Sequence, residues 1–109
     1  MNVNIEEWIW LNGEEVCPAR YLTEVSGLSN EELDDLIDNG IIVPVDDEIQ
    51  PGSFRMQHVV TAILARRLRD DFELDRHGVA LAMTLLRRVD ELEAELSTAQ
   101  ARLSRMTHT

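Results

Sequence analysis

The chain has 109 residues, 44% of them hydrophobic, so it can bury the core of one small domain but has little room for two. No apolar run approaches the roughly 18 residues of a membrane span, and the first residues lack the basic-then-apolar pattern of a signal peptide. These features argue against a membrane protein and predict a cytoplasmic one.

Acidic residues are concentrated in the amino-terminal half. The formal net charge is −11, and all ten basic residues are arginine. Residues 1–48 hold thirteen acids against Arg20 alone, whereas residues 49–109 hold eight acids and nine arginines. Nucleic-acid affinity depends mainly on neutralising phosphates, so a duplex would repel the first half. Such a surface is suited instead to a basic protein partner.

The histidines and the cysteine do not form a reactive pattern. Cys17 is the only cysteine, so no internal disulfide can form, and we expect a small buried side chain in a reducing compartment. His58, His77 and His108 show no metal-ligand spacing with one another or with Cys17, and no acid or nucleophile clusters near them. We therefore expect no enzyme, no catalytic or metal site and no cofactor.

The first seventeen residues predict a small β-hairpin. Asn12-Gly13 is a strong two-residue turn, and it leads into residues 14–17. Before the turn, apolar residues alternate at Val3, Ile5, Ile9 and Leu11. The alternation places Trp8 and Trp10 on the other face of the strand. There the two tryptophans either anchor a partner or pack on the domain's own helices.

Two short helices are expected next. Pro18 suits the first position of a helix, and apolar residues repeat at helical spacing until Gly27. Ser29 and Glu32 then form a capping box at the start of a second helix. Gly40 ends that helix, and Pro44 prevents the chain from resuming it. The order of helix, tight turn and helix predicts a helix-turn-helix.

The second helix carries an acidic face. Leu33, Leu36 and Ile37 share one side, and four carboxylates with no cation project from the opposite side, at Glu31, Asp34, Asp35 and Asp38. Such a run is either a solvated surface or a docking face for a basic partner.

A wing and a third helix follow. Residues 41–45 and 49–55 are expected to be two short extended pieces, joined through three further acids at Asp46, Asp47 and Glu48. From Met56 to Phe72 the large apolar residues form one helical stripe, at Val59, Val60, Ile63, Leu64, Leu68 and Phe72. Arg66, Arg67 and Arg69 flank this stripe as a candidate phosphate-binding patch, but the acids that follow them would pair with them or cancel them.

A long helix closes the chain, with Asp75 as its cap. Its early part, residues 79–86, is apolar enough to pack against the domain. Beyond it runs a coiled-coil seam of about three heptads, formed by Leu85, Val89, Leu92, Leu96, Ala99, Leu103 and Met106. A second copy of the chain is the expected mate, paired either antiparallel or parallel; the alternative is that the helix folds back on its own domain. We divide the chain into a domain of residues 1–74 and a helix of residues 75–109.

This arrangement resembles the mainly α, winged helix-turn-helix fold of MerR-type regulators, and within them the chaperone-modulator family. The residues that carry the resemblance are Ser29-Asn30-Glu31-Glu32-Leu33, Arg67-Leu68-Arg69, Leu74-Asp75, Gly78-Val79-Ala80-Leu81-Ala82-Met83-Thr84-Leu85 and Arg102-Leu103-Ser104-Arg105. The likeness extends over nearly the whole chain.

The resemblance implies an inhibitor that binds the J-domain of a co-chaperone, blocks its stimulation of Hsp70 and suppresses its DNA binding. The sequence fits, because carboxylates on the second helix match a basic J-domain face and would meet phosphates in a DNA groove. The candidate contacts are Glu31, Asp34, Asp35, Asp38, Asp46, Asp47, Glu48, Trp8 and Trp10. The competing hypothesis is a MerR-type DNA-binding regulator that uses Arg55, Arg66, Arg67 and Arg69.

Overall fold

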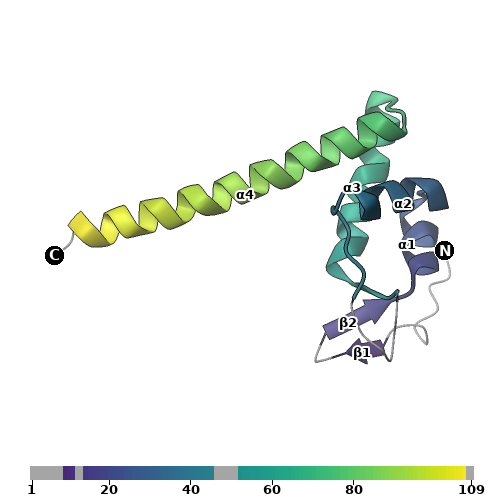
Figure 1. Ribbon diagram of the computed structural model, residues 1–109, viewed down its shortest axis with the longest axis horizontal. Coiled ribbons are helices and arrows are strands. Elements are labelled where there is room, and N and C mark those ends of the chain that lie inside the picture. Colours follow the sequence, from purple (N-terminus) through teal and green to yellow (C-terminus); the bar gives the residue numbers. More distant parts are fainter. Residues whose placement is uncertain (1–8, 12–13, 46–51, 108–109) are drawn as a thin grey trace.

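The computed structural model describes residues 9–11, 14–45 and 52–107. Within these ranges, three short strands and four helices follow one another (Figure 1). They are β1 (Ile9–Leu11), β2 (Glu14–Cys17), α1 (Ala19–Ser26), α2 (Asn30–Asp38), β3 (Phe54–Arg55), α3 (Gln57–Phe72) and α4 (Arg76–Thr107). The prediction of a mainly helical fold with a small N-terminal hairpin is confirmed.

The strands form one antiparallel sheet in the order β1-β2-β3. Leu11 pairs with Glu14, so two positions separate the strands, as a two-residue hairpin turn requires. Phe54 of β3 pairs with Cys17 of β2, and both side chains are buried. The sheet therefore joins the amino-terminal hairpin to the segment that leads into α3.

The helix-turn-helix forms where the local signals place it. Gly27 ends α1 in the left-handed conformation with φ of 83°, which favours glycine because it has no Cβ. Ser29 caps α2: its Oγ accepts the Glu32 N–H at 3.1 Å, and its own N–H donates to Glu32 Oε1 at 2.9 Å. Leu28 and Leu33, on either side of the cap, are both buried. The predicted capping box is confirmed.

One core holds the helices and the sheet together. Leu22 of α1, Leu36 of α2 and Ile42 have no exposed surface. The core also contains Cys17, Tyr21, Leu28, Leu33, Ile41, Phe54, Ala62, Ala65, Val79 and Met83. The prediction that Cys17 is a buried thiol is therefore confirmed.

The segment after α2 differs from the expected wing. Ile41 and Ile42 lie in the core, and the Ile41 N–H donates to the Leu36 carbonyl at 2.9 Å, which finishes the end of α2. None of residues 41–45 belongs to a strand, although the Val45 N–H donates to the Ser53 carbonyl at 2.7 Å. Residues 41–45 thus form no strand, and the part of the expected wing that the structure describes is the contact between Val45 and Ser53 together with β3.

Helix α3 buries only part of the apolar stripe that was expected to face the core. Ala62 and Ala65 are fully buried, whereas Val60 is 70% exposed and Phe72 is 68% exposed. Small side chains allow α3 to lie close against α1, and this close approach decides which face is covered. The predicted stripe is therefore confirmed at Val59 and Leu68, which pack against the core, and wrong at the exposed Val60, Leu64 and Phe72.

Helix α4 begins in the core and then leaves the domain (Figure 1). Asp75 Oδ1 accepts the Gly78 N–H at 2.8 Å, which confirms the predicted cap. Val79 and Met83 are buried in the common core. The rest of the helix projects away, so the alternative in which it folds back on its own domain is wrong. Across the described ranges, no helix is both long enough and apolar enough to cross a membrane.

Candidate functional site

The exposed side of α2 is the candidate binding surface. Burial of Leu33 and Leu36 fixes the helix by its apolar side. The opposite side carries Glu31, Asp34 and Asp38, whose residues are exposed. Each lacks an ion pair with any described residue. The structure therefore leaves three carboxylates of this helix open to solvent.

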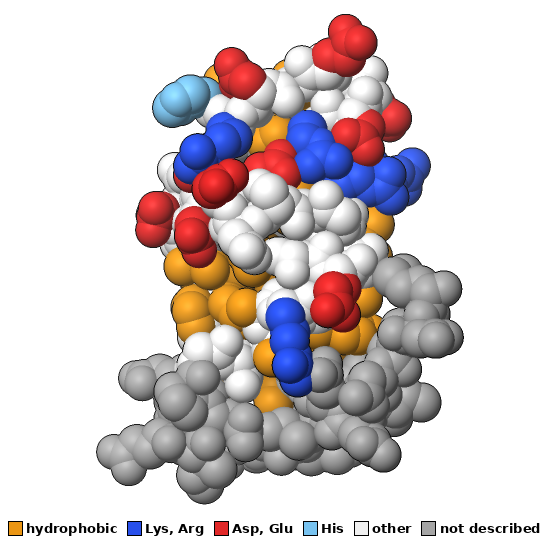
Figure 2. Space-filling view, turned by 90° about the vertical axis from the view of Figure 1, so that its right-hand side faces the viewer, with side chains coloured by type: hydrophobic (Ala, Val, Ile, Leu, Met, Phe, Trp, Pro, Cys, Tyr) orange, Lys and Arg blue, Asp and Glu red, His pale blue; other side chains and the backbone are white. Residues whose placement is uncertain are grey.

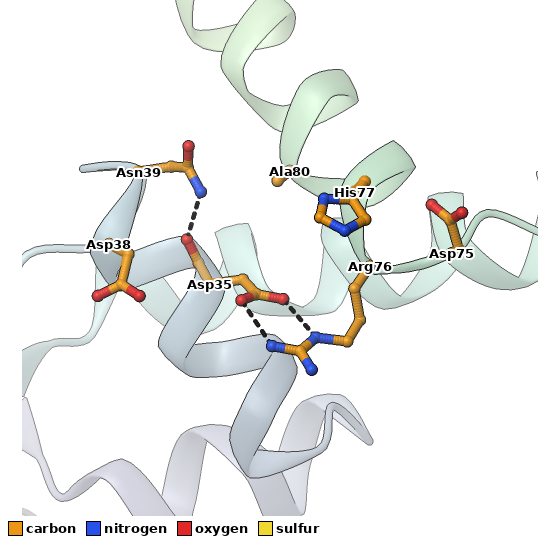
Figure 3. Close-up of a pocket in the computed structure, with 7 residues that line it drawn as sticks. All are labelled: Asp35, Asp38, Asn39, Asp75, Arg76, His77 and Ala80. Carbon is orange, nitrogen blue, oxygen red and sulfur yellow. Dashed lines mark hydrogen bonds and ion pairs between the residues drawn. The ribbon is translucent and has the colours of Figure 1, made fainter.

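The fourth carboxylate of the face is paired. Arg76, at the start of α4, donates from Nε to Asp35 Oδ2 at 2.7 Å and from Nη2 to Asp35 Oδ1 at 2.9 Å (Figure 3). This hydrogen-bonded guanidinium holds the pKa of Asp35 below its ordinary value. The expectation of four carboxylates with no cation is therefore wrong at Asp35, because a residue 41 positions later supplies one.

A hollow of about 520 Å³ lies beside this pair, between α2 and the first turn of α4. Its lining is formed by Asp35, Asp38, Asn39, Asp75, Arg76, His77 and Ala80 (Figure 3). The Asn39 amide donates to the Asp35 carbonyl at 2.7 Å, whereas the Asp38 carboxylate points away from Arg76. No group of acidic, histidine or cysteine side chains in the described ranges could hold a metal ion. The hollow is therefore an acidic corner next to a fixed guanidinium.

Three further arginines hold the helix-turn-helix in place. Arg66 Nε donates to the Ser26 carbonyl at the end of α1, at 3.0 Å. Arg69 Nη1 binds Glu32 Oε1 at 2.7 Å. At the other end of α2, Arg87 Nη1 donates to the carbonyls of Asn39 and Gly40, at 3.2 and 2.8 Å. The contacts of Arg66 and Arg87 satisfy carbonyls at helix ends, which have no partner within the helix, whereas Arg69 binds the carboxylate of the capping box.

The arginine contacts bear directly on the candidate phosphate patch. Arg66 and Arg69 also pair with Asp70, at 3.3 and 2.9 Å. Arg67 is exposed, and Arg55 already takes part in a polar or ionic interaction. Figure 2 shows arginine and acidic side chains interleaved on the face it presents. The structure thus does not bring the four arginines together as a free basic surface.

The remaining candidate contacts lie at the edge of the described chain or beyond it. Trp10 belongs to β1, where its backbone is opposite Glu15. Trp8, Asp46, Asp47 and Glu48 lie outside the described residues. Their part in any partner contact stays a prediction.

The predicted coiled-coil seam is exposed along its whole length. The exposed fractions of its large side chains are 57% for Leu85, 46% for Val89 and Leu92, 58% for Leu96, 62% for Leu103 and 73% for Met106. Ala99 is exposed as well. A row of apolar side chains this long on one helix is a candidate interface.

Comparisons with known proteins agree with this architecture. The sequence model of the MerR HTH family regulatory proteins matches residues 18–100. The chain is 35% identical to the chaperone modulatory protein CbpM of Citrobacter koseri over 80 residues, which are 73% of this chain and 79% of that protein. It is 34% identical, with the same coverage, to the proteins of that name from Salmonella paratyphi B and Salmonella newport.

Proposed function

The chain belongs to the MerR HTH family of regulatory proteins and is a chaperone modulatory protein, and we propose that it binds the J-domain of a CbpA-type co-chaperone through α2. Binding there would block the co-chaperone's stimulation of Hsp70 and suppress its DNA binding. Proteins of this kind are not enzymes, so the function lies in the contact itself.

One observation carries the proposal: Glu31, Asp34 and Asp38 are exposed on one helix and form no ion pair with the part of the chain that the structure describes. A J-domain presents a basic helix face to Hsp70, and an acidic helix can cover that face in its place. Complementary charge of this kind speeds association and selects the partner. The sequence-based candidates Asp35, Asp46, Asp47, Glu48, Trp8 and Trp10 would extend the contact around this centre.

The contacts of the arginines disfavour the DNA-binding alternative. In a DNA-binding relative, α2 would enter the major groove, where its carboxylates would meet phosphates on both sides. Arg66 and Arg69, which that alternative needs for phosphate contacts, are already bound to Ser26, Glu32 and Asp70. The fold is therefore better suited here to a protein partner.

Reversing charge on α2 tests the proposal. We expect the variant Asp34→Lys/Asp38→Lys to associate more slowly with a CbpA-type J-domain and to bind with less dependence on salt. The control Asp71→Lys/Glu73→Lys makes the same change in net charge at two exposed positions at the end of α3. Equal affinity of both variants and the wild type, measured on folded proteins, would remove α2 from the interface.

A second experiment separates the two functions. The protein is used to capture partners from a cell extract at low and moderate salt, with and without nuclease. Recovery of a J-domain protein that is weakened by salt and indifferent to nuclease supports the proposal. Recovery of DNA, or of partners that nuclease releases, supports the regulator, as would a retarded DNA band that is lost on substitution of Arg66 and Arg67.

We also propose that two chains pair through α4. The support is the exposed seam together with the charges along the helix, where acids precede the seam's centre and Arg102 and Arg105 follow it. An antiparallel pair brings these opposite charges together, whereas a parallel pair can use Arg88 and Glu93. Either arrangement would cover apolar surface that a single copy leaves in water.

A further inference from the structure

We propose that Arg76 competes with a basic side chain of the partner for the Asp35 carboxylate of α2. This competition lowers the affinity of α2 for its partner. The inference rests on the proposed contact between α2 and a basic J-domain. It adds a residue that lies outside α2 and that sets how strongly α2 binds.

The geometry gives Arg76 the place that a partner's arginine or lysine would take. Its guanidinium engages both oxygens of Asp35, at 2.7 and 2.9 Å, and such a bidentate pair is stronger and more specific than a single hydrogen bond. The Asp35 side chain is only 24% exposed, whereas the Arg76 side chain is 54% exposed. A positive charge is thus presented to solvent within the acidic surface, and the carboxylate beneath it is already occupied.

The helix that carries Arg76 does not by itself favour a cation there. Arg76 is the first residue of α4, and the positive end of a helix dipole disfavours an arginine at this end. Asp75 caps α4 by accepting the Gly78 N–H, and the Arg76 side chain takes no part in this hydrogen bond. Asp35, with electrostatic attraction from Glu31 and Glu32, therefore accounts for the position of the guanidinium.

An incoming basic side chain meets two penalties because of this pair. The carboxylate of Asp35 is withheld from it, and the Arg76 charge repels it. Asp38 points away from Arg76 across the hollow and stays available, as do Glu31 and Asp34 (Figure 3). Removing the guanidinium would free one carboxylate and remove one like charge, so binding should become tighter.

A purely structural role for the pair makes the opposite prediction. The contact also ties the start of α4 to α2, and these helices pack against each other in the core. If Arg76 served only to position α2, its loss would leave affinity unchanged or weaker. The direction of the change in affinity therefore separates the two roles.

The test compares Arg76→Gln with Arg67→Gln, each bound to a CbpA-type J-domain over a range of salt concentrations. Both variants lose one positive charge, and the control residue is likewise exposed, on α3. We expect Arg76→Gln to bind about two- to fivefold more tightly than Arg67→Gln at low salt, the scale of a partly exposed ion pair. The advantage should shrink as salt rises.

A second variant at the same position tests whether a change in fold, and not the loss of the charge, alters the affinity. Arg76→Lys keeps the charge but cannot form the bidentate contact with Asp35. The affinity of this variant for the J-domain should therefore lie between those of the wild type and Arg76→Gln. If Arg76→Gln binds no more tightly than Arg67→Gln while Asp34→Lys/Asp38→Lys still weakens binding, the inference is wrong and the proposed function stands. If reversal of Asp34 and Asp38 has no effect, both are wrong.

Discussion

Arg69 donates a 2.7 Å hydrogen bond to Oε1 of Glu32, the same oxygen that accepts the backbone N–H of Ser29. One carboxylate thus closes the first turn of α2 and ties it to α3. Only 11% of the Glu32 side chain is exposed, so solvent screens this contact less than an ordinary surface pair. The orientation of the candidate binding helix depends on this junction.

Replacing Glu32 with alanine should lower the free energy of unfolding by about 1–3 kcal/mol, because the capping box is broken and Arg69 loses a partner. Denaturation by urea measures the loss. The control is Glu31→Ala, which removes an exposed carboxylate next to it and should change stability by no more than about 0.5 kcal/mol. Equal losses in both variants would contradict the role given to Glu32.

The turn between α1 and α2 should depend on Gly27. A Cβ at this position would lie 3.6 Å from Arg66 Cγ, an ordinary contact, so the cost comes from φ of +83° rather than from a clash. We expect Gly27→Ala to cost about 1–2 kcal/mol of stability. Gly27→Asn should cost less, since asparagine tolerates the left-handed region better. Thermal unfolding of the two variants compares them, and an equal loss would point to a steric cause.

Cys17 should be unreactive in the folded protein, because burial raises the pKa of its thiol to about 11 from an ordinary value of 9.0. In the unfolded chain the thiol ionises first, so stability is unaffected below about pH 9 and falls between pH 9 and 11. Unfolding of the wild type and of Cys17→Ala across this range measures the effect. The same slope in both would show that another group is responsible.

Asp35 should make the free energy of unfolding depend on pH in the acid range. Its pKa is held below the ordinary value of 3.8 by the hydrogen bond from Arg76, so its contribution to stability is present above that value and is lost as pH falls toward the folded-state pKa. The stability difference between the wild type and Asp35→Asn should therefore shrink as the pH drops below 3.8. A difference that does not change with pH would contradict this assignment.

The seam of α4 should be needed for pairing of two chains. Leu92→Glu/Leu96→Glu places charge at its centre, and we expect this variant to sediment as a monomer at concentrations where the wild type is a dimer. Ala94→Glu/Ala101→Glu introduces the same charge on the opposite side of the helix and should leave the dimer intact. Dissociation of both variants would implicate net charge rather than the seam.

Local signals made the helix-turn-helix predictable. The capping box of Ser29 and Glu32 and the left-handed Gly40 act over a few residues, so they can be read from neighbouring positions of the sequence. The cap at Asp75 was found in the same way. The acidic residues of α2 were also located correctly, because their spacing along a helix decides which side they share.

The features that the sequence did not predict depend on contacts between residues far apart in the chain. Arg76 is close to Asp35 in space but far from it in sequence, and no periodicity predicts such a pair. A stripe drawn through large apolar residues missed Ala62 and Ala65, whose small side chains are fully buried where α3 lies close to α1. Arg66 and Arg69 were considered for phosphates, although the carbonyls and carboxylates that they bind come from α1 and α2.

The course of α4 has a thermodynamic consequence. Its outer turns are exposed and project from the domain (Figure 1), and most helical stability in proteins comes from packing that these turns lack within the described chain. Dilution, which separates the two chains of the proposed dimer, should therefore destabilise the outer part of α4 but not the core. In the proposed dimer, backbone amides of the core would exchange with solvent at rates independent of protein concentration, whereas those near Leu96 would exchange faster as the protein is diluted.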